Sequence, residues 1–176
     1  MTVMYEQNDI LVYGNNGVCR LVDIRRERFG GAYGMYYILA PLYDSRSRYY
    51  VPVGSDKLKA RLRPVMEKGE LDGMMNAARG GEAVWEPDDR KREHDFHEIV
   101  SRGLSEELIG VMRTLLLRKR TLMHDTRRLR SADEKVLSLC EKIVSEEYAC
   151  AFGVDVGDAL SYIRGELLGE PKDAPC

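Results

Sequence analysis

Residues 9–53, "DILVYGNNGVCRLVDIRRERFGGAYGMYYILAPLYDSRSRYYVPV", determine the fold of the first part of this chain. They hold short runs rich in β-branched and aromatic residues, at 10–13, 18–28, 35–42 and 48–53. Turn residues separate the runs, and the pairs Asn-Gly at 16–17 and Gly-Gly at 30–31 accept the positive φ angles that tight hairpins need. So few strands cannot bury both faces of an open sheet. We therefore predict a small closed or half-open β-barrel.

From about residue 67 onward, apolar residues recur with the 3.6-residue period of an α-helix. The predicted helices cover 70–79, 88–102, 105–123, 131–152 and a last short stretch within 154–169. Ser105 and Asp155 are expected to cap two of them, and Ser131 with Glu134 to form a capping box. The apolar stripes of the two longest helices are Leu108, Ile109, Met112, Leu115 and Leu116, and Val136, Leu139, Cys140, Ile143, Val144 and Tyr148.

These patterns together predict an α+β protein made of two domains. An all-β module is expected over residues 1–66 and an all-α helical bundle over 67–168. The polar, proline-containing residues 169–176 are expected to form a disordered tail.

The composition is that of an ordinary soluble protein, with 44% hydrophobic residues, 32% charged residues and a net charge of −2. Its apolar runs are far shorter than the ~20 residues that span a bilayer, so we expect no membrane role. No basic segment followed by an apolar one marks a secretory signal at the N-terminus. The cysteines show no C-x-x-C spacing. We expect a cytoplasmic protein with no disulfide, no metal and no cofactor.

Signatures of catalysis are scarce. The sequence contains no G-x-S-x-G, no phosphate-binding G-x-x-x-x-G-K and no G-x-G-x-x-G, so we do not expect an enzyme. His94 and His97 are three residues apart and could share a helix face, which leaves a small metal-dependent enzyme as one hypothesis. Against it, no histidine has a glutamate three residues before it, as a di-iron bundle requires.

Basic residues gather around the junction of the helices predicted at 105–123 and 131–152. A solvated helix cap is one explanation, because the helix dipole favours cations at a C-terminus. The dipole accounts for one or two charges, however, and this cluster is larger, which favours a phosphate-binding surface. The cluster comprises Arg113, Arg118, Lys119, Arg120, Arg127, Arg128, Arg130 and Lys135.

The only tryptophan, Trp85, lies in "AVWEPDDRKR" (83–92), between acidic and basic residues. It either anchors the edge of a core or is an exposed group that touches a partner. Arg90, Lys91 and Arg92 follow it at the start of a predicted helix, where the dipole disfavours cations. If they converge with the cations at 118–135, Trp85 stands beside a phosphate-binding face. There it could enter a distorted minor groove or stack on an unpaired base.

The β module carries a candidate interface of its own. Its strands are rich in tyrosine and arginine, which are enriched at binding hot spots, although about half of the alternating side chains must fill the barrel. These residues are Arg25, Arg26, Arg28, Tyr33, Tyr36, Tyr37, Tyr43, Arg46, Arg48, Tyr49 and Tyr50.

Several stretches resemble a known family when they are taken in order. They are "NDILVYGNNGVCRLVDI" (8–24), "YYILAPLYDSRSRYYVPV" (36–53), "LRPVM" (62–66), "VWEPDDRKR" (84–92), "ELIGVMRTLLLRKR" (107–120) and "SADEKVLSLCEKIVSEEYACAFG" (131–153). The chain resembles the CarD/CdnL-family transcription factors. Their N-terminal RNA polymerase interaction domain is a Tudor-like or SH3-like half-barrel shared with the transcription-repair coupling factor.

The resemblance implies a bacterial transcription regulator without enzymatic activity, located in the cytoplasm and on the nucleoid. In that family the N-terminal domain binds the β subunit of RNA polymerase. The helical domain contacts promoter DNA, largely without sequence specificity, at the upstream edge of the transcription bubble. A tryptophan there enters the minor groove and stabilises the open complex, and its counterpart here is Trp85. With the basic clusters described above, the predicted DNA-binding residues are Trp85, Arg90, Lys91, Arg92, Arg118, Lys119, Arg120, Arg128 and Lys135.

The chain departs from the family at two positions expected to meet the polymerase. Glu27 occupies a position where relatives often carry an arginine, and Tyr50 replaces an arginine just before "VP". The predicted polymerase-binding residues are Arg26, Arg28, Arg48 and Tyr50. We expect a monomer, with a strand-swapped dimer as the alternative. A second functional hypothesis, favoured by the acidic residues within 86–98, is a protein-only adaptor on RNA polymerase whose Trp85 contacts another protein.

Overall fold

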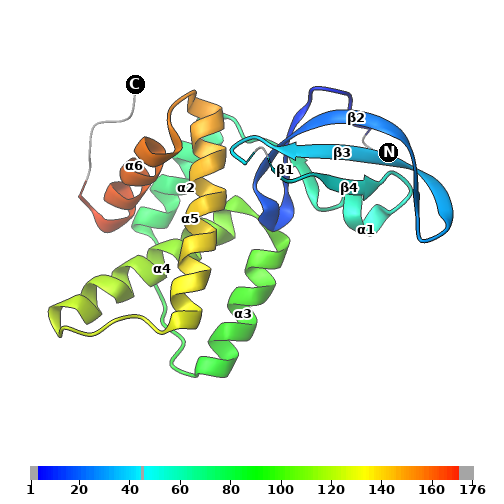
Figure 1. The fold of residues 1–176 in the computed structure, drawn as a ribbon. Helices are drawn as coiled ribbons and strands as arrows, with labels where there is room; N and C mark the ends of the chain where they lie inside the picture. The colour runs from blue at the N-terminus through cyan, green and yellow to red at the C-terminus, as the bar shows by residue number, and fades with distance from the viewer. Residues whose placement is uncertain (1–3, 45, 171–176) are drawn as a thin grey trace. The chain divides into compact units, whose positions relative to one another are not determined.

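The structure, a computed structural model, describes residues 4–44 and 46–170. The chain divides into two compact units, Met1–Val65 and Met66–Cys176. The first unit contains the strands and the second consists of helices, so the predicted α+β class is confirmed (Figure 1). Of the predicted tail, residues 171–176 lie outside the described residues. Gly169 and Glu170 belong to the turn that closes the last helix.

The N-terminal unit is one antiparallel sheet with the strand order β4-β3-β2-β1-β5 (Figure 1). Within the described residues the two edge strands do not pair with each other, so the sheet is a half-open barrel rather than a closed one. Its strands are β1 (Ile10–Tyr13), β2 (Val18–Phe29), β3 (Ala32–Pro41), β4 (Tyr49–Pro52) and β5 (Leu62–Pro64).

A long hairpin of β2 and β3 dominates this sheet. Its turn is formed by Gly30 and Gly31 with φ angles of 58° and 86°, values that residues with a Cβ rarely adopt, as the sequence predicts. A bulge interrupts the pairing between Leu21 and Asp23. The sheet curves over a small core whose buried residues are Leu11, Tyr13, Cys19, Leu21, Tyr37, Leu39, Val51 and Leu62.

The sequence analysis missed two short elements of this unit. The helix α1 (Asp56–Lys59), which Ser55 caps, and the strand β5 are four and three residues long. Elements this short show no periodicity. Pairing with β1 forms β5, with Tyr13 opposite Leu62.

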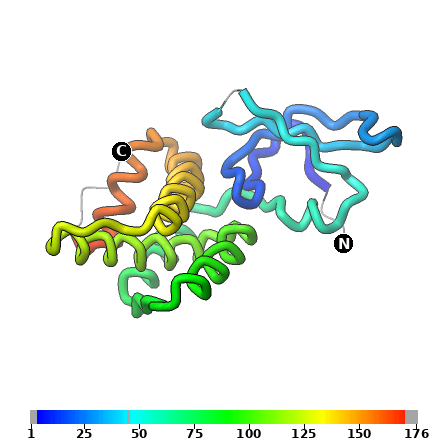
Figure 2. Tube along the Cα trace, turned by 60° about the horizontal axis from the view of Figure 1, so that its bottom comes forward, coloured from blue at the N-terminus to red at the C-terminus, as the bar shows by residue number. Residues whose placement is uncertain are grey.

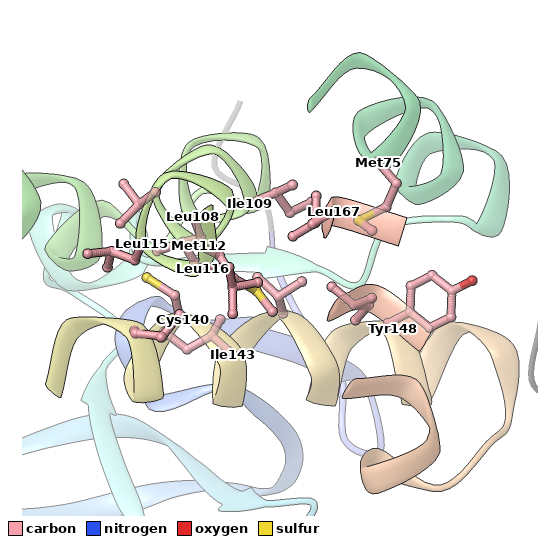
Figure 3. Packing of buried hydrophobic residues seen from close by; sticks show 14 of the residues in the cluster. Met75, Leu108, Ile109, Met112, Leu115, Leu116, Cys140, Ile143, Tyr148 and Leu167 are labelled. Carbon is pink, nitrogen blue, oxygen red and sulfur yellow. The ribbon is translucent and has the colours of Figure 1, made fainter. Parts of the chain in front are cut away.

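The second unit is a bundle in which α5 packs against α4, α6 and α3. Figure 3 shows Met112, Leu115 and Leu116 of α4 facing Cys140 and Ile143 of α5. All five are buried, as their helical spacing predicts. The helices are α2 (Lys68–Gly80), α3 (Asp89–Arg102), α4 (Ser105–His124), α5 (Ser131–Phe152) and α6 (Val156–Leu168). No helix among the described residues is long and apolar enough to cross a membrane.

Two predicted helix caps are wrong. Ser105 is the first residue of α4 rather than its cap, and its hydroxyl donates instead to the carboxylate of buried Glu147. Ser131 likewise lies inside α5, whose N-cap is Arg130, so the predicted capping box is absent. The cap at Asp155 is confirmed, since its carboxylate accepts hydrogen bonds from the first turn of α6.

Candidate nucleic-acid interface

Trp85 lies in the segment between α2 and α3 and is half-buried. One part of its side chain packs against the hydrophobic core of the helical unit, and the rest is accessible. The packing hypothesis is therefore supported, and contact of the accessible part of the indole with a partner stays a prediction.

Two guanidinium groups lie over the indole ring. The Cζ atom of Arg92 is 4.3 Å from the ring centroid, and that of Arg118 is 4.9 Å away. Both distances fall within the range of cation–π attraction. The contacts tie the Trp85 segment to α3 through Arg92 and to α4 through Arg118.

Arg92 is buried, with 1% of its surface exposed. Its Nε and Nη2 atoms donate to both oxygens of Asp133 at 3.0 and 2.9 Å, and Nη2 also donates to Asp89 at 2.7 Å. Nη1 donates to the carbonyl oxygen of Glu86 at 2.9 Å. The hydrogen bonds to Asp133 raise the pKa of Arg92. Arg92, predicted to contact DNA, is thus the centre of a buried ion-pair network.

Arg118 has a different environment. Within residues 4–44 and 46–170 it forms no ion pair, and its Nε atom is buried without a hydrogen-bond partner. It lines a hollow of about 340 Å³ together with Trp85, Arg127, Arg128 and Leu129. Arg92 and Arg130 line it too, as do their partners Asp89 and Asp133, so an anion entering the hollow would meet three arginines without an ion pair beside the indole.

A larger groove of about 930 Å³ lies next to this hollow and shares Arg127, Arg128 and Leu129 with it. The segment 125–130 turns back after α4 and leads into α5 (Figure 2). Arg127, Arg128 and Leu129 of this segment line the groove. Its basic lining residues are Lys119, Arg127, Arg128, Lys135 and Lys142, its apolar ones Met123, Leu129 and Leu139, and its single carboxylate is Glu134.

The cations of this groove differ in how they are paired. Lys119 bonds to Glu134, and Lys142 pairs with Glu146. For Arg127, Arg128 and Lys135, the described part of the chain offers no ion-pair partner. The α4–α5 junction therefore carries an excess of unpaired positive charge.

Arg90 and Lys135 line a third hollow, of about 570 Å³, formed between α3 and α5. Lys135 also lines the large groove, so this hollow adjoins it. His94 and His97 lie here as well. Among the described residues, no group of three or more histidine, cysteine, aspartate or glutamate side chains is placed to hold a metal ion.

The remaining predicted DNA-binding residues lie apart from these hollows or are paired. Lys91 bonds to Glu86 and thereby lowers the pKa of that carboxyl group. Arg120 donates to the carbonyl oxygen of Leu168 at 3.0 Å and points toward α6 rather than toward Trp85. It also approaches Glu170, at 3.6 Å.

The acidic residues after Trp85 are largely neutralised within the unit. Glu86 pairs with Lys91, and Asp89 with both Arg92 and Arg130, at 2.7 and 3.1 Å. The hydrogen bond from Arg92 is the main cause of the lowered pKa of Asp89. Of the three carboxylates in "EPDD", two are thus ion-paired, and Asp88 caps α3 by accepting from the backbone N–H of Lys91.

In the N-terminal unit, the predicted polymerase-binding residues divide between two faces of the sheet. Arg26 and Arg28 both lie over the ring of the exposed Tyr33, with Cζ-to-centroid distances of 4.9 and 5.5 Å. Tyr50 packs edge-on against Phe29, whose position in β2 alternates with that of Arg28. Arg48 donates to the carbonyl oxygen of Ser47 at 2.7 Å.

Sequence reasoning missed two contributors to the helical site. Asp133 holds Arg92, but the two residues are 41 positions apart, so only the tertiary structure brings them together. Arg127 belongs to the basic cluster and lines both the groove and the hollow beside Trp85, although it was not among the predicted contacts.

Residues 5–66 match the family model described as the CarD-like/TRCF RID domain. The match covers the half-open barrel, and the helical unit lies beyond it. No curated protein matches the chain.

Proposed function

We propose that this chain regulates transcription initiation, because its residues 5–66 match the CarD-like/TRCF RID domain, a family that interacts with RNA polymerase. The N-terminal unit binds the polymerase β subunit. The helical unit contacts promoter DNA at the upstream edge of the bubble and stabilises the open complex. The observation that carries this proposal is a partly exposed tryptophan beside three arginines, Arg118, Arg127 and Arg128, that form no ion pair within the described residues.

Phosphate contacts supply most of the affinity in this proposal. Arg118, Arg128 and Lys135 offer cations that need not break an ion pair of the described unit before they bind. Each neutralised phosphate releases condensed counterions, so the affinity falls steeply with salt. Because such contacts carry no base identity, binding is largely independent of sequence.

Trp85 supplies the selectivity for melted DNA. A bubble edge offers unstacked bases and a distorted minor groove that intact duplex lacks. Stacking one base on an aromatic ring contributes about 1–3 kcal/mol, which corresponds to roughly a 5- to 150-fold shift of the opening equilibrium. A group that binds only the open state stabilises that state alone.

The protein-only adaptor is the less supported alternative. Its main argument was the acidic stretch 86–98, and three of the six carboxylates there, those of Glu86, Asp89 and Glu93, are engaged by Lys91, Arg92 and Arg130. The unpaired cations around the groove have no role in an adaptor that avoids nucleic acid.

A salt titration of DNA binding tests the proposal. The slope of log K against log salt should be markedly negative for the wild type and less negative by about one unit in Arg128→Ala and in Lys135→Ala. Arg102→Ala is the control, because Arg102 is an exposed residue in the last turn of α3 that pairs with Glu107. DNA binding that is absent, or that has no salt slope, would favour the adaptor.

The polymerase contact is tested separately. Arg26→Ala with Arg28→Ala removes the cations of one sheet face, whereas Tyr50→Ala alters the aromatic group of the other. We expect at least one of these variants to weaken binding to the polymerase β subunit while DNA binding stays unchanged. Wild-type binding by both would contradict these predicted contacts.

A further inference from the structure

Burying an arginine lowers the stability of a protein unless its charge is paired, and Arg92 is buried in the helical unit. Its guanidinium donates to three separate segments: Asp133 in α5, Asp89 at the start of α3, and the backbone of Glu86 next to Trp85. The same flat group lies against the indole. This convergence indicates that holding Trp85 is the function of the network.

We propose that Arg92 is a positioning residue for Trp85 and that Asp133 fixes Arg92 in place. The inference rests on the proposed function. It differs from the role that the sequence predicts for Arg92, because it makes Arg92 act through the indole rather than on phosphate.

The bidentate contact with Asp133 determines the plane of the guanidinium. Two parallel hydrogen bonds to one carboxylate leave the group little freedom to rotate. The indole, whose centroid lies 4.3 Å from Arg92 Cζ, packs against this fixed group. Trp85 lies in a segment without helix or strand, so its orientation depends on such side-chain contacts. Preorganised in this way, the indole loses little conformational entropy on binding.

The second arginine on the indole has no such anchor. Arg118 stacks at 4.9 Å but has no carboxylate partner in the described part of the unit. A DNA phosphate can therefore recruit Arg118 while Arg92 stays in place. Arg92 therefore holds the indole in place, and Arg118 binds a phosphate of the DNA backbone.

The single tryptophan makes the proposal directly measurable, because the intrinsic tryptophan fluorescence reports on Trp85 alone. In Asp133→Asn the carboxylate that fixes Arg92 is lost while the side-chain volume is kept. We expect its acrylamide quenching constant to rise at least twofold over wild type. Glu141→Gln is the matched control, since Glu141 also lies on α5 and makes a bidentate pair, with Arg164, far from the indole. It should leave quenching unchanged.

A salt titration of Arg92→Met separates positioning from phosphate contact. On DNA with an unpaired bubble, a positioning role predicts weaker binding with an unchanged salt slope, whereas a phosphate contact predicts a slope less negative by about one unit, as in Arg128→Ala. If Asp133→Asn does not fold, Arg92→Met combined with Asp133→Leu replaces the pair by apolar side chains and leaves no charge buried.

Wild-type quenching in the folded Asp133→Asn variant, or a reduced salt slope in Arg92→Met, would overturn the positioning role. If instead the proposed function is wrong, the wild type itself will bind no DNA. The quenching constants of wild type and Asp133→Asn would still differ, because that measurement involves no DNA.

Discussion

At the scale of single residues, the proposed function depends on the cations that surround Trp85. Arg92 and Arg118 both contact the indole, yet one is enclosed by carboxylates and the other is not. The sequence predicts a phosphate contact for both, because it does not show which arginine has a carboxylate partner in the folded protein. Only the tertiary partner Asp133 distinguishes them.

Acid should loosen the Trp85 segment. Lys91 lowers the pKa of Glu86 below 4.5, and Arg92 lowers that of Asp89 below 3.8. Since both folded-state values lie below the unfolded ones, their stabilising contribution is complete above about pH 5 and disappears as the pH falls through the folded values. We expect acrylamide quenching of Trp85 to be constant from pH 7 to 5 and to rise below about pH 4. A rise already between pH 7 and 5 would contradict this assignment.

At the scale of elements, the helices are predicted well where a long apolar stripe repeats, as in α4 and α5. Short elements are not predicted well. The strand β5, for example, forms only through its pairing with β1. The start of α4 shows a related limit. Ser105 has the right chemistry for a cap, but the buried carboxylate of Glu147 engages its hydroxyl. Local signals fail where a distant side chain competes for the same group.

The contact between α4 and α5 should dominate the stability of the helical unit. Leu115 is completely buried in this contact, and Leu115→Ala should destabilise the protein by about 2–5 kcal/mol through lost burial and a residual cavity. Met123→Ala on the same helix is the control, because Met123 is 65% exposed and its loss should change stability by less than about 0.5 kcal/mol. Chemical denaturation measures both, and similar effects of the two changes would argue against this packing.

At the scale of the whole molecule, the chain joins a unit that matches the CarD-like/TRCF RID domain to a helical unit with a groove rich in cations. The family and the α+β class could be predicted from the order of the motifs. The arrangement of the site could not, because it depends on where α3, the α4–α5 turn and the Trp85 segment meet. Arg120 and Lys119 adjoin in sequence, yet one points toward α6 and the other lines the groove.

The central claim is that Trp85, held by Arg92, stabilises the open promoter complex. The most direct measurement is the lifetime of that complex on a labelled promoter with purified RNA polymerase, without the protein, with wild type and with Trp85→Ala. The variant must first be shown to fold and to bind polymerase like wild type. We predict that wild type lengthens the lifetime roughly 5- to 150-fold, as expected for one stacked base, and that Trp85→Ala loses this effect. Equal lifetimes with wild type and Trp85→Ala would contradict the claim.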